Sequence, residues 1–398
     1  MYTGPHIIKD GLVFGYDTGY GVADNSTATR FYPGEPTTNA VPLSTFINTS
    51  NWTGAGWSGS IAVSADYDNT LELTSTNGWR TFRVDTGITS GGTVTVSYEY
   101  KMKTLATASV FMMNLNGDHL GSYVNNLGNI SASDTQDLSN WKTFTGTFTA
   151  NSNSNLAIGL RGSDNGGLTD TIYVRNLQVE LNGHVTPYTT TSRSSTASLI
   201  DLKETIDIDV SSMSFDSTGQ PDFDGTDDIL YANAENDYPY PYHSWEVWFK
   251  TNQVDSGGSA GLVGLDYGRT MYLTATNGGN IVYTLYSNMS SPNVLVLSIS
   301  GGTNLLDNEW HQVVCSRGTS AAEIWVDGSL VKTASNGGQA TWNGINQWSG
   351  MAARFGDNPN NSGLKFTGPI PIIKIYNKQL SGAEVLQNYN AQKSRFGL

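Results

Sequence analysis

Clustered acidic side chains are the first residues in this chain whose types and spacing indicate chemistry. The run Phe223–Asp228 reads FDGTDD, and the run Phe355–Ser362 reads FGDNPNNS. Hard cations such as calcium prefer carboxylate and amide oxygens. We therefore take as candidate calcium ligands Asp227, Asp228, Asp357 and Asn358. Neither run has the spacing of a known calcium loop, so solvated turn residues are the alternative, and no other cofactor is expected.

Catalytic constellations are not found in the sequence. Retaining glycoside hydrolysis needs two carboxyl groups on one face, close together, and the nearest run, Glu323–Gly328, has its acids four residues apart across a predicted turn. The five histidines are scattered without zinc-ligand spacing. The one cysteine, Cys315, falls in a predicted strand and is expected to be a buried, inert thiol. We expect a protein that is not an enzyme.

Aromatic side chains beside amides offer a second kind of chemistry, the binding of sugars. Tyrosine and tryptophan provide large contact areas at a small cost in side-chain entropy. Three loops combine such rings with polar neighbours, and their candidate glycan-binding residues are Tyr238, Tyr240, Tyr242, Trp342, Asn343, Trp348, Trp52 and Trp57. Packing in a core or at a subunit interface is the alternative for each.

Charge and hydropathy exclude several partners. The net charge is −14, whereas nucleic-acid binding needs clustered Lys and Arg. The same charge disfavours anionic membranes, and no window approaches a membrane-spanning length of apolar residues. The start MYTGPHIIKDGLVFGYD lacks the pattern of a signal peptide. We expect synthesis in a cytoplasm, with neither nucleic acid nor membrane as a partner.

The elements that must position these residues are mostly strands. Trp245, Val247 and Phe249 alternate with Glu246, Trp248 and Lys250, and this period of two predicts a strand. Asp327-Gly328 predicts a tight hairpin turn. Ser381 with Glu384 three residues on predicts a capped C-terminal helix. The rest is rich in Gly, Thr, Ser and Asn, so the predicted class is all-β with one short C-terminal helix.

The order of motifs carries a resemblance. FDGTDD, WEVWF, EWHQVVCSR, IWVDGSLV and the closing segment Ile373–Leu398 follow one another. Together they resemble a concanavalin-like or laminin-G-like lectin domain, and the closing segment resembles versions in tailed-phage virion proteins. Upstream, WKTFTGTF and IYVRNLQVE resemble jelly rolls of carbohydrate-binding modules. The resemblance implies two jelly-roll β-sandwiches that bind and assemble.

The function implied by this resemblance is that of a virion structural protein. Its location would be the virion, as a capsid decoration, head fibre or tail appendage. Its partners would be other virion proteins, further copies in a homo-oligomer, and glycans of a host surface. The alternative is a soluble glycan-binding protein or an accessory module of a polysaccharide-degrading system.

The lectin-like motifs are split along the chain, which predicts an insertion. Gly11–Gly21 resembles the opening strand of such domains, yet its continuation comes only at Ser198–Asp209. We expect residues 1–37 to join residues 193–398 in one sandwich and residues 38–192 to form a second sandwich inserted in a loop of the first. Loops tolerate insertions because closure entropy grows slowly with length. Two sequential domains with a short N-terminal arm are the alternative.

Overall fold

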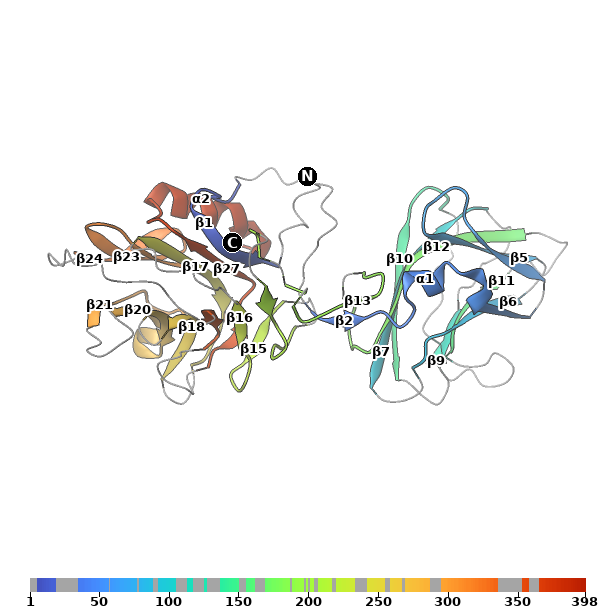
Figure 1. The fold of residues 1–398 in the computed structure, drawn as a ribbon, viewed down its shortest axis with the longest axis horizontal. Coiled ribbons are helices and arrows are strands. Elements are labelled where there is room, and N and C mark those ends of the chain that lie inside the picture. The colour runs from blue at the N-terminus through green and yellow to red at the C-terminus, as the bar shows by residue number, and fades with distance from the viewer. Residues whose placement is uncertain are drawn as a thin grey trace. The chain divides into compact units, whose positions relative to one another are not determined.

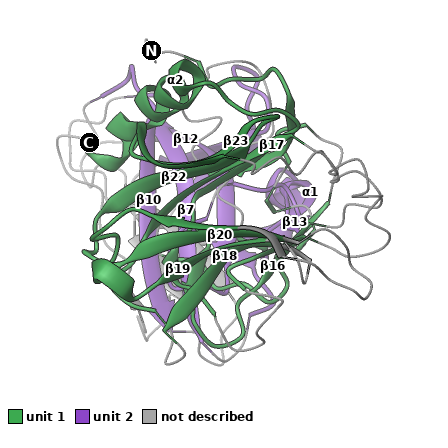
Figure 2. Ribbon diagram, turned by 90° about the vertical axis from the view of Figure 1, so that its left-hand side faces the viewer, with its two compact units in different colours: residues 1–36, 194–398 green, residues 37–193 purple. Residues whose placement is uncertain are grey.

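The computed structural model shows an all-β chain that divides into two compact units. Unit 1 comprises Met1–Pro36 with Ser194–Leu398, and unit 2 comprises Thr37–Arg193 (Figure 2). The structure describes residues 6–18, 35–56, 58–76, 79–88, 92–104, 113–116, 125–126, 137–149, 155–161, 169–186, 188–196, 198–199, 201–203, 207–216, 220–232, 242–254, 258–266, 269–286, 295–335, 353–357 and 365–398.

Unit 1 is a sandwich of two antiparallel sheets (Figure 1). The six-stranded sheet has the order β1 (Leu12–Asp17), β27 (Ile372–Tyr376), β17 (His243–Lys250), β22 (Trp310–Arg317), β23 (Ala321–Val326) and β24 (Ser329–Ser335). The seven-stranded sheet has the order β14 (Ile208–Asp209), β16 (Leu230–Ala232), β25 (Ala353–Phe355), β18 (Ser259–Asp266), β19 (Arg269–Thr274), β20 (Asn280–Tyr286) and β21 (Leu295–Gly301). A short pair, β15 (Asp222–Asp224) with β26 (Thr367–Pro369), accompanies them.

Strand β17 shows how the sequence pattern builds this sandwich. Trp245, Val247 and Phe249 are fully buried in the core between the two sheets. Glu246 and Trp248 are buried as well, although they point to the opposite face. A central strand that is buried on both faces requires a third layer, and the C-terminal helix provides it.

Strand β1 joins the N-terminal segment to the far end of the chain. It pairs antiparallel with β27, with Phe14 opposite Ile375 and Tyr16 opposite Ile373. Phe14 also stacks on Phe355 of the seven-stranded sheet, with ring centroids 5.5 Å apart. Strands of one sandwich therefore lie on both sides of unit 2 in the sequence, which is the chain order that the predicted insertion requires.

Helix α2 (Gly382–Gln392) forms the third layer of unit 1. Ser381 accepts the backbone N–H of Glu384, and the Glu384 side chain accepts the N–H of Ser381, so the predicted capping box is confirmed. Val385 is buried in a small core with Leu12, Val314, Tyr376 and Leu380. Leu386, the next residue, is 47% exposed, because only one narrow side of the helix faces the sheet.

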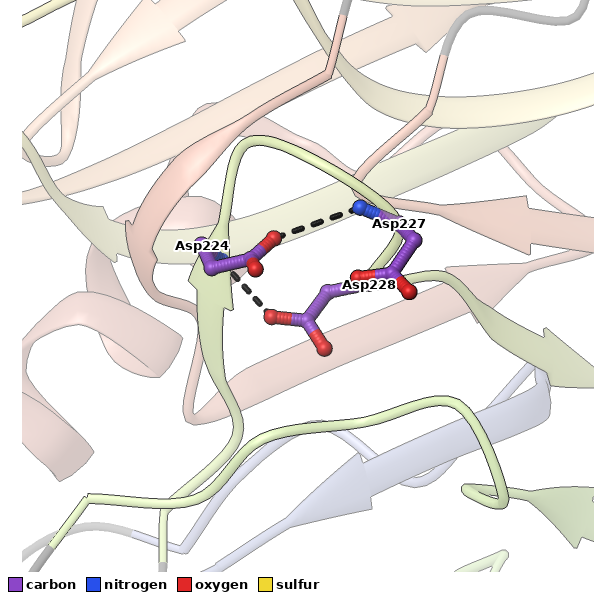
Figure 3. A group of neighbouring side chains, drawn as sticks. All are labelled: Asp224, Asp227 and Asp228. Atoms are coloured by element: carbon purple, nitrogen blue, oxygen red, sulfur yellow. Dashed lines mark hydrogen bonds between the residues drawn. The ribbon is translucent and has the colours of Figure 1, made fainter.

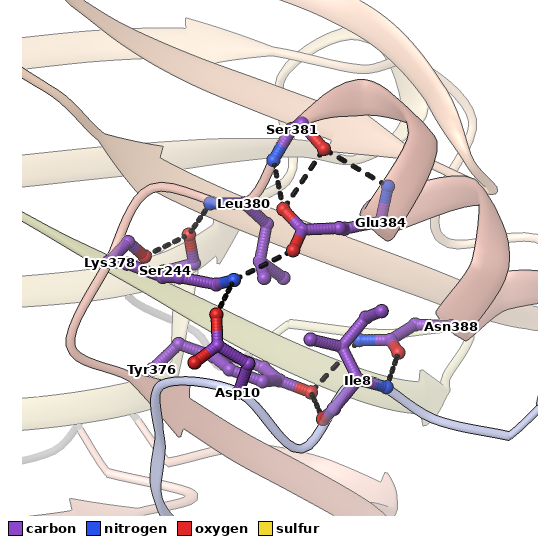
Figure 4. Close-up of polar contacts among 9 residues, drawn as sticks. All are labelled: Ile8, Asp10, Ser244, Tyr376, Lys378, Leu380, Ser381, Glu384 and Asn388. Carbon is purple, nitrogen blue, oxygen red and sulfur yellow. Dashed lines mark hydrogen bonds and ion pairs between the residues drawn. The ribbon is translucent and has the colours of Figure 1, made fainter.

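The N-terminal segment is bound directly to this helix (Figure 4). The backbone N–H of Ile8 donates to Asn388 Oδ1 over 2.7 Å, and the Tyr376 hydroxyl donates to the Ile8 carbonyl over 3.2 Å. The Lys378 ammonium bridges Asp10 and Glu384 at 2.5 and 2.7 Å. These contacts hold both ends of unit 1 on one side of the six-stranded sheet.

Unit 2 is a second, smaller sandwich. One sheet has the order β10 (Lys142–Thr149), β7 (Thr93–Met102), β12 (Thr169–Glu180), β5 (Thr70–Thr76) and β4 (Gly59–Val63). The other has the order β3 (Trp52–Gly56), β6 (Trp79–Asp85), β11 (Asn155–Arg161), β8 (Met113–Asn116) and β9 (Asn125–Asn126). Their shared core includes Leu71, Phe82, Val96, Tyr98 and Val174.

The two ends of unit 2 lie side by side. Strand β2 (Thr37–Thr38) pairs antiparallel with β13 (Ser192–Arg193). An insertion whose ends meet in this way fits a surface loop without spreading the strands on either side of it. A helix of one turn, α1 (Leu43–Phe46), follows β2 and was not expected from the sequence. Among the helices in the described part of the chain, none is long and apolar enough to cross a membrane.

Candidate functional site

The acidic turn after β15 gathers three carboxylates. Ligand oxygens of Asp224, Asp227 and Asp228 all lie within 4.8 Å of one another (Figure 3). Gly225 holds a positive φ of 78°, which permits the chain to reverse directly after the strand. The FDGTDD motif thus forms a turn, in which the side chains of Asp224 and Asp228 accept hydrogen bonds from nearby backbone.

Three of these six carboxylate oxygens already accept backbone hydrogen bonds. Asp224 Oδ1 accepts the N–H groups of Thr226 at 2.6 Å and Asp227 at 3.3 Å. Asp228 Oδ2 accepts the N–H of Asp224 at 2.7 Å, and its Oδ1 accepts the N–H of Ser214 at 2.8 Å. The hydrogen bond from Thr226 lowers the pKa of Asp224, whereas burial raises the pKa of Asp228.

This donor set fits calcium poorly. Calcium takes six to eight oxygen ligands in proteins, whereas both oxygens of Asp228 and one oxygen of Asp224 point at backbone N–H groups. The geometry is that of a turn in which aspartates satisfy the backbone. Asp228 in particular is buried and connects the turn to Ser214.

Asp357, the other described acid among the calcium candidates, is placed among cations. Its side chain is buried, with Arg354 Nη1 at 3.4 Å and Lys365 Nζ at 3.9 Å. Two positive neighbours balance its charge, which leaves little attraction for a metal ion. Asn358 lies outside the described residues.

Of the aromatic candidates for glycan binding, Tyr242 is described and accessible. It directly precedes β17 and is 42% exposed. Six other candidates lie outside the described residues, namely Trp57, Tyr238, Tyr240, Trp342, Asn343 and Trp348. Their proposed role therefore stays a prediction.

Trp52 requires a correction. It was expected to present its ring to a sugar, but it is only 7% exposed and belongs to the core of unit 2. Its indole N–H donates to the Phe46 carbonyl at 2.9 Å, and its ring packs edge-on against Phe46 at 6.1 Å. The unforeseen helix α1 brings Phe46 over the ring, so Trp52 fastens α1 to the sandwich.

Glu246 is the carboxylate of unit 1 whose position on a central strand invites a catalytic interpretation. Its Oε1 accepts hydrogen bonds from Lys374 Nζ and Gln312 Nε2, both at 2.9 Å, and its Oε2 accepts from Asn388 Nδ2 at 2.7 Å. Asn388 belongs to α2, so the helix covers this part of the strand face. Glu246 has no exposed atoms with which to protonate a substrate.

His311 forms a constellation that the sequence did not reveal. Its Nδ1 lies 2.9 Å from Asp327 Oδ2, and its Nε2 lies 3.2 Å from Asp307 Oδ1. Burial lowers the pKa of His311, but the hydrogen bonds and charges of Asp327 and Asp307 outweigh it, and the pKa lies above its ordinary value. Asp327 was expected only as a turn residue. Its φ of 50° confirms the turn, and its side chain also holds the histidine.

A family model matches a large part of unit 1. Residues 224–386 match the model of the concanavalin A-like lectin/glucanases superfamily. The match covers less than half of the chain, and it begins at the acidic turn and ends within α2. Residues 224–386 of unit 1 are thus similar to concanavalin A-like lectin and glucanase domains. No curated protein matches the sequence.

Solved structures with distant similarity are also known. The binding domain of botulinum neurotoxin DC, in a complex with rat synaptotagmin II, is 16% identical, with a TM-score of 0.37 and coverage of 48% of either chain. The Ruminococcus gnavus IT-sialidase CBM40, bound to alpha2,3 sialyllactose, is 14% identical, with a TM-score of 0.30 and coverage of 39% of this chain and 94% of that one. The chain spans about half the length of the toxin domain.

Proposed function

We propose that this protein is a non-enzymatic, glycan-binding component of a tailed-phage particle. The observation that carries the binding half is a combination in unit 1. Residues 224–386 match lectins and glucanases, while the central-strand carboxylate Glu246 is sealed under α2 in a buried ion pair. A glucanase needs two accessible carboxyl groups facing the scissile bond, whereas a lectin needs none.

The particle half of the proposal is supported by the closing segment. Its sequence resembles the end of lectin domains in tailed-phage virion proteins, and it forms the capped helix that completes unit 1. Many copies on one particle would convert weak single contacts into avidity. In this proposal one sandwich contacts neighbouring virion proteins, and exposed aromatic side chains such as Tyr242 reach outward.

The test has two arms. Mass spectrometry of purified particles should find peptides of this chain, and a glycan array should bind the full-length protein. Incubation with polysaccharides should release no reducing ends. Absence from particles would refute the particle role. Release of reducing ends that is lost on changing Glu323 or Asp327 would refute the non-enzymatic role.

A further inference from the structure

The outer face of the β10–β7–β12–β5–β4 sheet of unit 2 carries an unusual row of side chains. Tyr173 of β12 lies between Lys101 of β7 and Glu72 of β5 in the strand register. All three alternate with core residues of unit 2, so they point away from the core. Trp141, which directly precedes β10, extends the row beyond Lys101.

Three aromatic rings gather on this face. Tyr67, from the loop between β4 and β5, meets Tyr173 edge-on at 5.0 Å and Trp141 edge-on at 5.4 Å. Trp141 and Tyr173 are 6.4 Å apart. We call Tyr67, Trp141 and Tyr173 the outer aromatic cluster. Tyr173 is its buried floor, while Tyr67 and Trp141 are half-buried and reach solvent.

Charged groups surround the outer aromatic cluster in fixed positions. The Arg175 guanidinium lies over the Trp141 ring at 3.8 Å and bonds Glu99 through Nε at 2.6 Å. Lys101 Nζ donates to the Tyr67 hydroxyl at 3.1 Å. The face of the Arg175 guanidinium therefore lies on the Trp141 ring, and its edge bonds the Glu99 carboxylate. This arrangement leaves the Arg175 side chain little conformational freedom.

A second set of charges binds the other side of the cluster. Lys103 Nζ contacts Glu72 at 2.9 Å and Asp66 at 3.1 Å, and the Tyr173 hydroxyl donates to Asp66. The hydrogen bond to Glu72, followed by that to Asp66, raises the pKa of Lys103. The hydrogen bond from Tyr173, together with Lys103, lowers the pKa of Asp66. Lys103 and Asp66 are therefore ionised at neutral pH.

The charges of this face balance. Three cations, Lys101, Lys103 and Arg175, stand among three carboxylates, Asp66, Glu72 and Glu99. A ligand with a net negative charge would meet these carboxylates and a chain of net charge −14. A neutral ligand bearing many hydroxyl groups meets no such penalty, because each hydroxyl both donates and accepts.

We propose that the outer aromatic cluster and its charged neighbours bind a pyranose ring of a neutral oligosaccharide. The apolar C–H face of the sugar rests on Tyr67 and Trp141, and its hydroxyls bond the Lys, Arg and carboxylate groups beside them. Ion pairs that are already formed suit sugar binding, because their donors and acceptors are positioned before the ligand arrives. This inference rests on the glycan-binding function proposed above and assigns it to unit 2.

The same sheet provides a matched control. Thr145 and Thr147 of β10 are on the same face as Trp141, farther along the strand, and Thr145 is exposed. Thr145→Ala changes an exposed side chain of this face without touching the cluster. Tyr67 lies in a loop outside the core, so Tyr67→Ala removes a ring without opening the sandwich. Tyr67→Phe keeps the ring and loses the bond from Lys101.

The experiment is calorimetric titration of the full-length protein with cellohexaose, mannohexaose and xylohexaose, with hexagalacturonate as the acidic comparison. We expect at least one neutral hexasaccharide to bind and hexagalacturonate not to bind. Tyr67→Ala and Arg175→Gln should each weaken binding by about tenfold, as for central contact residues. Tyr67→Phe should have a smaller effect and Thr145→Ala none. Circular dichroism of each variant checks that the fold is retained.

The outcomes separate the two proposals. Binding that Tyr67→Ala and Arg175→Gln leave unchanged overturns this inference while the glycan-binding function stands. Binding of hexagalacturonate alone also overturns it. If the wild-type protein binds nothing on a broad glycan array either, both this site and the proposed function fail.

Discussion

Lys374 and Glu246 form an ion pair of 2.9 Å in which neither side chain has any exposed surface. The pair connects β27 to β17, and three amides complete it. Gln312 and Asn388 donate to the carboxylate, and Gln392 accepts from the ammonium at 2.8 Å. Two of these amides belong to α2, so the helix is held over the sheet by polar contacts as well as by Val385.

The first prediction concerns this pair. Lys374→Met should lower the free energy of unfolding of unit 1 by about 3–5 kcal/mol, because it leaves a buried carboxylate without its counter-ion. The double variant Lys374→Met with Glu246→Gln should lose less than the sum of the two single changes. Denaturant unfolding followed by tryptophan fluorescence measures this.

The control for the first prediction is the exposed pair of Lys378 with Asp10, whose aspartate side chain is 87% exposed. Asp10→Asn should change stability by less than about 1 kcal/mol, since surface ion pairs contribute little. Equal losses in Asp10→Asn and Lys374→Met would contradict the argument from burial.

The second prediction concerns the helix cap. Ser381→Ala removes the side chain that accepts the N–H of Glu384 and should cost about 1 kcal/mol. Ser329→Ala, at an exposed position of β24, serves as the control and should be close to neutral. Thermal unfolding of the two variants beside the wild type distinguishes them, and a neutral Ser381→Ala would show that the cap contributes nothing.

Patterns of period two and local turn chemistry predicted much of this fold. The alternation around Trp245, the turn at Asp327-Gly328 and the box at Ser381 are local signals, and each forms where predicted. Predicting the insertion required only that the opening strand of the lectin-like domain be recognised far from the rest of that domain in the sequence. Strand β1 pairs with β27 across more than 350 residues of sequence, and Leu12 lies opposite Tyr376 in this pairing.

The sites were harder to predict because they depend on strand order. Trp141 alternates with Phe144 and Phe148 in opposite phase, so its outward position was readable from the sequence. Its neighbours could not be predicted, because Tyr67 comes from the loop between β4 and β5 and Tyr173 comes from β12. Trp52 was misassigned for a different reason, because Phe46, which packs against its ring, belongs to a helix that was not expected.

The third prediction concerns the acidic turn. Asp228→Ala leaves the N–H groups of Ser214 and Asp224 without their acceptor and should cost about 1–3 kcal/mol. Asp227→Ala removes an exposed carboxylate and should stay within about 0.5 kcal/mol. The unfolding midpoint should be the same in the presence of calcium as in the presence of EDTA. A midpoint that calcium raises in the wild type but not in Asp227→Ala would instead establish a calcium site here.

The fourth prediction is a pH dependence that originates at His311. Because the folded state raises its pKa above the ordinary value of 6.5, the histidine adds stability that is fully present below about pH 6.5. That contribution is lost as the pH rises through the folded pKa, because only the protonated ring donates to both Asp307 and Asp327. The stability difference between the wild type and His311→Gln should therefore shrink from pH 6 to pH 8.5. Unfolding at a series of pH values measures it, with His6→Gln, an exposed histidine, as the control. A difference that stays constant over this range would show that the two aspartates do not favour the charged ring.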